Sequence, residues 1–363
     1  MLTRIEKSLR DLTAIPGLSG HEQKVARYMK EHFEALGLET KTDIFGNCIA
    51  KVPGKRTGGP VAMLFAHMDS LGFLIRKIED DGFLRVERLG GIPEKVLPAT
   101  QVQVETKNGE ILEGVFGVKD HHVTPPEEKY IVDRYMNLFL DIGVRSKKEA
   151  ESLGVYIGSP VVYKPKFMKL NDSRFCASSI DNRGGCATLL EVAALLTENR
   201  PESTVYLVGT VQEEYNLRGA MIAARSIHPD ISVCVDIIGA TDTPDLKDRG
   251  DVSCGDGPVM SMYNFHGRGT LNGTIPHPAI VRLFEQAAEK NGISFQRLAS
   301  IGWLTDNAYL QLEENGVMSI DLGFPGRYTH GPCEVADMKD IDGLCRWVFA
   351  FLHSINDKTN FER

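Results

Sequence analysis

The distribution of apolar and polar residues along the chain predicts an α/β fold. Unbroken apolar runs occupy residues 61–66, 204–209, 232–235 and 317–320. Runs without alternation are typical of strands that are covered on both faces, as in a mostly parallel sheet. Helical patterns fall between or after these runs, over residues 186–196, 219–227, 278–291 and 306–315. Strands that alternate with helices indicate a mostly parallel sheet flanked by helices.

Two further helices are predicted before the first strand. The pattern of residues 1–38 is helical apart from a break at residues 15–20, which contain Pro16 and two glycines. Ser19 is the candidate N-cap of the second helix, because a serine hydroxyl can accept a hydrogen bond from an N–H group of the first turn.

The pattern changes between residues 72 and 163. Short segments with alternating polar and apolar residues, such as residues 101–105, are separated by glycines and prolines, and only residues 147–153 have a helical pattern. Such alternation is typical of half-buried antiparallel strands. We therefore expect a small all-β domain over residues 72–163, inserted into an α/β domain formed by residues 1–71 and 164–363.

Charge and hydropathy narrow the range of partners. The 363 residues include 41 basic and 49 acidic side chains, a formal net charge of −8. This balance argues against sequence-independent binding of nucleic acid, which depends on many Lys and Arg contacts to phosphates. No window approaches the roughly 20 apolar residues that cross a bilayer, and no apolar secretory stretch follows the charged N-terminal segment. We expect a cytoplasmic protein that binds neither nucleic acid nor membranes.

The seven cysteines form no C-x-x-C pair and are expected to be mostly buried apolar residues.

Histidines and carboxylates lie at the ends of the four predicted strands and before one predicted helix. In chain order these residues are His67, Asp69, Asp181, Glu213, Glu214, Asp236 and His330. In open α/β sheets, ligands bind in the crevice beyond the carboxyl ends of the strands. A mixture of imidazoles and carboxylates favours zinc, cobalt or manganese over calcium or magnesium. The sequence therefore predicts a site for a divalent metal at this edge.

The spacing of these residues suggests different roles within the site. If residues 67–69 stay extended, His67 and Asp69 face the same side, and Asp69 can accept the second ring N–H of a metal-bound His67. Glu213 and Glu214 are adjacent and should diverge. One can then bind metal while the other holds a proton above it.

Five segments of the chain match a known family in order and spacing. They are Ala66-His67-Met68-Asp69, Ile180-Asp181-Asn182-Arg183-Gly184-Gly185-Cys186, Val211-Gln212-Glu213-Glu214, Asp236 and Arg327-Tyr328-Thr329-His330-Gly331-Pro332. Over essentially its whole length the chain resembles the glutamyl aminopeptidase and tetrahedral (TET) aminopeptidase family of dinuclear metallo-aminopeptidases, some of which are labelled endoglucanase. It departs from the family pattern at Ser70 and around Trp303, without losing a ligand.

The resemblance implies a zinc-peptidase-like fold with a small β-barrel insertion that is used in dimerisation. It also implies two divalent metal ions per subunit, with zinc favoured and cobalt or manganese as alternatives. Family members often form dodecamers, so a homo-oligomer based on dimers is implied.

The resemblance also assigns roles to the seven residues. Asp181 would bridge the two metal ions. Glu214 and His330 would complete one site, and His67 and Asp236 would complete the other. Glu213 would be the general base, and Asp69 would orient and polarise His67.

We expect a metal-dependent aminopeptidase that hydrolyses the N-terminal residue from short peptides. One alternative is a glycoside hydrolase of the endoglucanase type with a pair of carboxylates, but such an enzyme has no use for His67 and His330. A second alternative is a non-catalytic metal-binding scaffold, which would need neither Asp69 nor Glu213.

Overall fold

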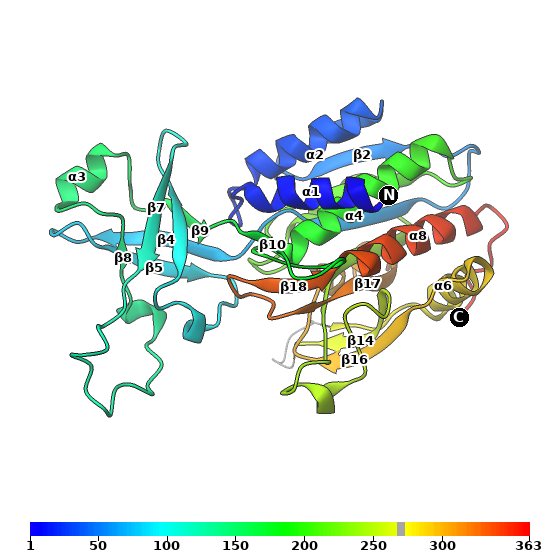
Figure 1. Cartoon of the computed structure of the whole chain (residues 1–363). Coiled ribbons are helices and arrows are strands. Elements are labelled where there is room, and N and C mark those ends of the chain that lie inside the picture. Colours follow the sequence, from blue (N-terminus) through cyan, green and yellow to red (C-terminus); the bar gives the residue numbers. More distant parts are fainter. Residues whose placement is uncertain (267–272) are drawn as a thin grey trace.

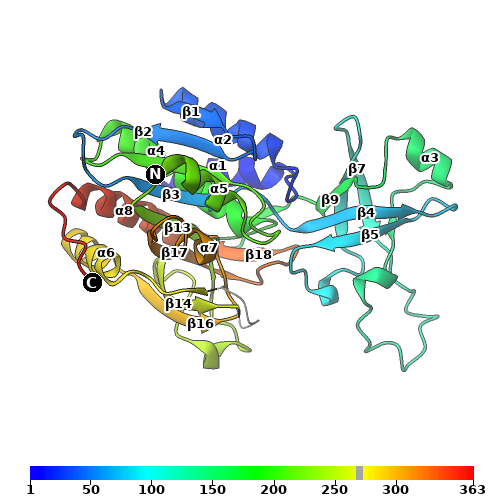
Figure 2. The same ribbon diagram turned by 180° about the vertical axis from the view of Figure 1, so that it is seen from behind.

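The computed structural model describes residues 1–266 and 273–363 and contains a helix-covered sheet with a barrel beyond one end of it (Figure 1). Both chain termini lie on the part of the molecule that holds the sheet, as the reverse view also shows (Figure 2). The predicted α/β fold with an inserted β-barrel is confirmed. No helix among the described residues is both long and apolar enough to cross a membrane.

The sheet has 12 strands within the described residues. These strands are β1 (Glu39–Thr42), β2 (Cys48–Val52), β3 (Ala62–His67), β10 (Phe167–Lys169), β11 (Arg174–Ala177), β12 (Val205–Thr210), β13 (Ile231–Gly239), β14 (Val259–Phe265), β15 (Gly273–Thr274), β16 (Gln296–Ile301), β17 (Met318–Arg327) and β18 (Glu334–Asp337). The main path runs β1-β2-β12-β3-β13-β17-β18-β11-β10, and β14 pairs with β15, β16 and β17.

The four apolar runs form the centre of this sheet. Strands β12, β3, β13 and β17 are neighbours and all parallel, so their carboxyl ends lie at one edge. Most of the flanking pairs are antiparallel, and β14 and β16 pair in parallel, so the sheet is mixed. Strand β17 continues seven residues beyond the predicted run, to Arg327, because Asp321, Gly323 and Pro325 interrupt the apolar pattern but not the backbone pairing.

Helices cover both faces of the sheet. One face carries α1 (Leu2–Ala14), α2 (Gln23–Ala35), α4 (Ile180–Glu198), α6 (Pro278–Asn291) and α8 (Met338–Ser354), whose apolar residues form the largest core. The opposite face carries α5 (Gly219–Ile227) and α7 (Asn307–Leu310) over a smaller core. The rings of Phe284 and Phe351 stack at 3.8 Å between α6 and α8. Burial on both faces explains why the central strands are uniformly apolar.

Two local predictions were wrong. The second helix has Glu22 at its N-cap position, and the Ser19 hydroxyl instead donates a hydrogen bond to Asp69. The helix predicted over residues 306–315 is limited to α7, and turns follow it up to Gly316, with Glu314 in the left-handed region. The prediction for the cysteines is confirmed, since all seven are free and six are buried.

The inserted barrel is closed by six strands in the order β4-β5-β8-β7-β6-β9, and the paired neighbours are antiparallel. The strands are β4 (Gly72–Ile78), β5 (Leu84–Leu89), β6 (Gln101–Glu105), β7 (Ile111–Phe116), β8 (Leu140–Asp141) and β9 (Pro160–Tyr163), with helix α3 (Lys147–Ser152) between β8 and β9. Inside the barrel, the rings of Phe73 and Phe116 meet edge to face at 5.0 Å. A role of the barrel in dimerisation stays a prediction.

Candidate metal centre

The histidines and carboxylates at the strand ends meet beside one cavity of about 430 Å³. His67 is the last residue of β3, Asp236 lies near the end of β13, and Glu213 and Glu214 follow β12. Asp181 lies at the start of α4. His330 follows β17 and completes the set around the cavity. The parallel centre of the sheet therefore brings together residues that are as much as 263 positions apart in sequence.

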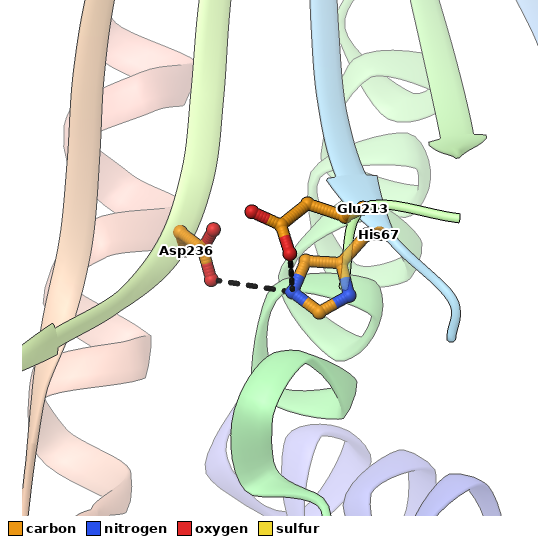
Figure 3. A group of neighbouring side chains, drawn as sticks. All are labelled: His67, Glu213 and Asp236. Atoms are coloured by element: carbon orange, nitrogen blue, oxygen red, sulfur yellow. Dashed lines mark ion pairs between the residues drawn. The ribbon is translucent and has the colours of Figure 1, made fainter. Parts of the chain in front are cut away.

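One candidate metal-binding group consists of His67, Glu213 and Asp236 (Figure 3). The Nε2 atom of His67 lies 3.9 Å from Glu213 Oε2 and 3.7 Å from Asp236 Oδ1. One potential ligand atom from each residue lies within 4.8 Å of the others. These separations are too long for hydrogen bonds and leave room for an ion between the side chains.

The second candidate group consists of Asp181, Glu214 and His330. His330 Nε2 lies 3.4 Å from Asp181 Oδ2 and 3.9 Å from Glu214 Oε1. The other Asp181 oxygen, Oδ1, lies 3.0 Å from Nε2 of His67 in the first group. The Asp181 carboxylate thus lies between the two groups and directs one oxygen toward each imidazole.

The charges of this site suit divalent cations. Burial raises the pKa of Glu214 to about 7 and raises the pKa of Glu213 and of Asp236 well above the usual range. Burial alone would lower the pKa of His330, but the carboxylates of Glu214 and Asp181 raise it to about 11. The buried Oε1 atom of Glu214 has no hydrogen-bond partner among the described residues. Carboxylates crowded together out of water need positive charge nearby, and two metal ions would supply it.

Asp69 contacts both His67 and the turn that follows β12. His67 Nδ1 lies 3.1 Å from the Asp69 carbonyl oxygen and 3.4 Å from Asp69 Oδ1. The fully buried Asp69 carboxylate also accepts hydrogen bonds from the backbone N–H groups of Glu213 and Glu214, at 3.0 and 3.1 Å. The expected contact between His67 and Asp69 is therefore present, and it involves the backbone carbonyl as well as the side chain.

Glu334 contributes to the site but was not predicted from the sequence. It is buried on β18, its Oε2 accepts a hydrogen bond from the N–H of Asp181 at 3.0 Å, and its Oε1 accepts one from the N–H of His330 at 2.8 Å. Burial raises the pKa of Glu334 to about 8. One carboxylate therefore fixes the backbone of two candidate ligands that come from different elements.

The Glu334→Gln variant tests this arrangement. An amide has one acceptor oxygen, so one of the two buried N–H groups loses its partner. We expect the affinity for metal at the Asp181, Glu214 and His330 group to fall about 10–100-fold, as is typical when a partner of a ligand is lost. Titration of chelated protein with Co²⁺ measures the change.

The matched control is Asp337→Asn on the same strand, because Asp337 accepts its hydrogen bonds from Lys339 N and Ser173 Oγ and contacts no candidate ligand. Asn caps a helix about as well as Asp, so the helix should stay capped and Co²⁺ binding should stay unchanged. Equal Co²⁺ affinities in the two variants would contradict a specific role of Glu334.

The backbone around the site is held in sparsely populated conformations. Nine non-glycine residues of the described chain have a positive φ. Six of them lie within three residues of a candidate ligand: Ser179, Gln212, Asn216, Leu217, Tyr328 and His330. Such conformations persist only where the surrounding structure holds them, and they cluster at functional sites.

The barrel supplies one wall of the cavity, which the sequence did not predict. Gly91 and Pro93 from the loop after β5 line the cavity, and His330 Nδ1 lies 2.7 Å from the Gly91 carbonyl oxygen. The lining also includes Ile237 and Trp303, and the Trp303 indole lies so close to Gly239 that a β-carbon there would be 1.8 Å from the ring. The cavity lining therefore combines charged side chains with apolar ones.

Comparisons with known proteins agree with this geometry. The model of the M42 glutamyl aminopeptidase family matches residues 46–346. The lysyl aminopeptidase of Pyrococcus furiosus is 31% identical over 353 residues, which cover 96% of both chains. Among solved structures, aminopeptidase APDkam598 from Desulfurococcus kamchatkensis is 32% identical with a TM-score of 0.92, covering 98% of this chain and 96% of that one. The Pyrococcus horikoshii TET1 peptidase, which can assemble into a tetrahedron or a large octahedral shell, is 30% identical with a TM-score of 0.85, covering 96% of this chain and 99% of that one.

Proposed function

Because the chain belongs to the M42 glutamyl aminopeptidase family of peptide-bond hydrolases, we propose that it removes the N-terminal residue from short peptides at the candidate metal centre. The observation that carries this proposal is the position of the Asp181 carboxylate between two groups that each contain one histidine. Such a pair of neighbouring groups is suited to two metal ions that act together.

Five residues would hold the metal ions. Asp181 would bridge them, with His67 and Asp236 on one side and Glu214 and His330 on the other. The mixture of imidazole and carboxylate donors suits zinc, and also cobalt or manganese. When bound, two divalent ions lower the pKa of water and polarise a carbonyl group.

Glu213 is the proposed general base. Its carboxylate lies in the first group, 3.9 Å from His67, and burial raises its pKa, which makes it a stronger proton acceptor than an exposed carboxylate. It would take the proton of the attacking water and deliver it to the amine that leaves. Asp69 would hold His67 through Nδ1 and fix the Glu213 backbone at the same time.

The two candidate metal-binding groups contain more carboxylates than imidazoles, which favours an exopeptidase. A peptide with a free α-amino group brings one positive charge, which would be stabilised next to the buried acids. An internal peptide bond offers no such charge. The apolar walls near Ile237 and Trp303 would contact the N-terminal side chain.

The two alternatives receive less support from the geometry. A glycoside hydrolase with two carboxylates would not need an imidazole in each group. A non-catalytic scaffold would not need Glu213 buried beside the proposed ligands.

We further propose homo-oligomers based on dimers, because apolar side chains of the loop after β7 are exposed, including Tyr130 at 94% and Val123 at 67%.

Release of amino acids from an N-terminally free peptide and its N-acetylated form tests the proposed function. We expect cleavage of the free peptide only, loss of that activity after chelation, and recovery when zinc or cobalt is added. Chelation would not affect a hydrolase that works with two carboxylates alone. Protein that binds two metal ions per chain and cleaves neither peptide would refute the peptidase proposal.

A further inference from the structure

The segment between α1 and α2 lies against the metal centre, although it precedes residue 46, where the match to the family begins. Leu18 forms an isolated parallel bridge with Ser70, which follows directly after Asp69. The N–H of Ser19 donates to the Ser70 carbonyl oxygen at 3.2 Å, and the N–H of Ser70 donates to the Gly17 carbonyl oxygen at 2.8 Å. The segment is thus hydrogen-bonded to the chain where it leaves β3.

Three consecutive backbone N–H groups after β12 are all held by buried carboxylates. The N–H of Gln212 donates to Glu22 Oε1 at 3.1 Å. The next two, from Glu213 and Glu214, donate to Asp69 Oδ1 and Oδ2 at 3.0 and 3.1 Å. Glu22 is 4% exposed and Asp69 is fully buried, so water cannot easily replace either acceptor.

Gln212, the first of these three residues, has an unusual backbone conformation. Its φ is +58°, in the left-handed region that residues with a β-carbon rarely adopt. Such a conformation relaxes unless neighbouring groups hold it, and relaxation would swing Glu213 and Glu214 together. The Glu22 acceptor is the contact from outside the turn that holds the Gln212 N–H.

The segment also fixes the two acceptors themselves. Glu22 Oε1 accepts a second hydrogen bond from the N–H of Gly20 at 2.6 Å, which holds the glutamate side chain in place. The Ser19 hydroxyl donates a short hydrogen bond to Asp69 Oδ2, the same oxygen that accepts from the Glu214 N–H. One short segment therefore sets the position of both carboxylates.

We propose that Glu22 and Ser19 are positioning residues that direct Glu213 into one metal group and Glu214 into the other. The expected effect on hydrolysis rests on the proposed function. The expected effects on metal binding and on the backbone of residues 212–214 do not.

Two substitutions of Glu22 separate reach from charge. Glu22→Gln removes the charge but keeps an oxygen at the Oε1 position, so it can still accept from Gln212 and Gly20. Glu22→Asp keeps the charge but is one methylene shorter, so its oxygens no longer reach the Gln212 N–H. A matched pair at the second position is Ser19→Thr, which keeps the hydroxyl, and Ser19→Ala, which removes it.

Three measurements on the whole chain of 363 residues test the proposal. Steady-state hydrolysis gives kcat and KM, Co²⁺ titration of chelated protein gives the affinity of the two metal groups, and amide hydrogen exchange reports opening of residues 205–217. For Glu22→Asp and Ser19→Ala we expect kcat to fall on the order of 10–100-fold with little change in KM. Co²⁺ binding at the group that contains Glu214 should weaken by a similar factor, and amide exchange in the turn should become faster. Glu22→Gln and Ser19→Thr should stay within about threefold of the unaltered protein, well inside that range.

Equal losses in Glu22→Gln and Glu22→Asp would overturn the proposal, because charge rather than reach would then matter. Faster exchange throughout the sheet, with a matching drop in folded protein, would also overturn it in favour of a general structural role. If the unaltered protein cleaves no peptide, the proposed function fails, yet Co²⁺ affinity and local exchange still decide the role of Glu22.

Discussion

Replacement of Glu213 by glutamine is expected to lower kcat for peptide hydrolysis by about 10²–10⁴-fold, the range that a general base contributes. Glutamine has nearly the same shape, and its backbone N–H can still donate to Asp69, so the turn stays in place. The amide cannot accept a proton from water. Assays across a range of peptide concentrations would show the loss in kcat with KM nearly unchanged.

Metal content separates this loss from damage to the site. Glu213→Gln should still bind two ions per chain, because the five proposed ligands are intact. Glu110→Gln, at an exposed position in the barrel, serves as the control and should keep full activity. If Glu213→Gln retained activity within a few-fold of the unaltered protein, Glu213 could not be the base.

Replacement of Asp181 by asparagine is expected to have the largest effect on metal binding. The carboxylate offers one oxygen to each group, at 3.0 Å from His67 and 3.4 Å from His330. An amide presents N–H₂ in place of one oxygen, so one or both ions lose a ligand. Since losing a partner of a ligand already costs about 10–100-fold, we expect metal affinity to fall further and hydrolysis to become undetectable.

Thermal unfolding with and without added zinc measures the loss of metal binding directly. A ligand at about 100 times its Kd stabilises a folded protein by about 2.7 kcal/mol, so zinc should raise the Tm of the unaltered protein and not that of Asp181→Asn. Asp236→Asn, which affects one group only, should retain part of this shift. A full zinc-induced shift in Asp181→Asn would contradict the bridging role.

Most of the candidate site could be predicted from the sequence because its ligands follow buried strands. His67, Asp236 and His330 each come at or soon after an apolar run, and parallel strands must bring such ends to one edge. The apolar runs were visible because helices cover both faces of the central strands. The place of these residues after the apolar runs was therefore enough to predict that they lie close together in the fold.

Residues that act on backbone groups could not be predicted in this way. Glu334 accepts hydrogen bonds from the N–H groups of Asp181 and His330. In the sequence alone, a glutamate with this role cannot be distinguished from a solvent-exposed one. Ser19 fits the pattern of a helix cap, but its hydroxyl donates to Asp69, because the long-range contact with a buried carboxylate outweighs the local preference. These contacts depend on tertiary structure alone.

The hydrogen bond between His330 and Gly91 means that the barrel is not independent of the candidate metal centre, although it lies beyond one end of the sheet. Excision of residues 72–163 would leave every proposed ligand in the chain and most of the sheet intact. It would also remove the carbonyl that faces His330 Nδ1 and the Tyr163 hydroxyl that contacts the His330 carbonyl oxygen at 3.4 Å. A minimal version of this protein must therefore retain the barrel, and an exchange of barrels between relatives would also exchange part of the candidate site.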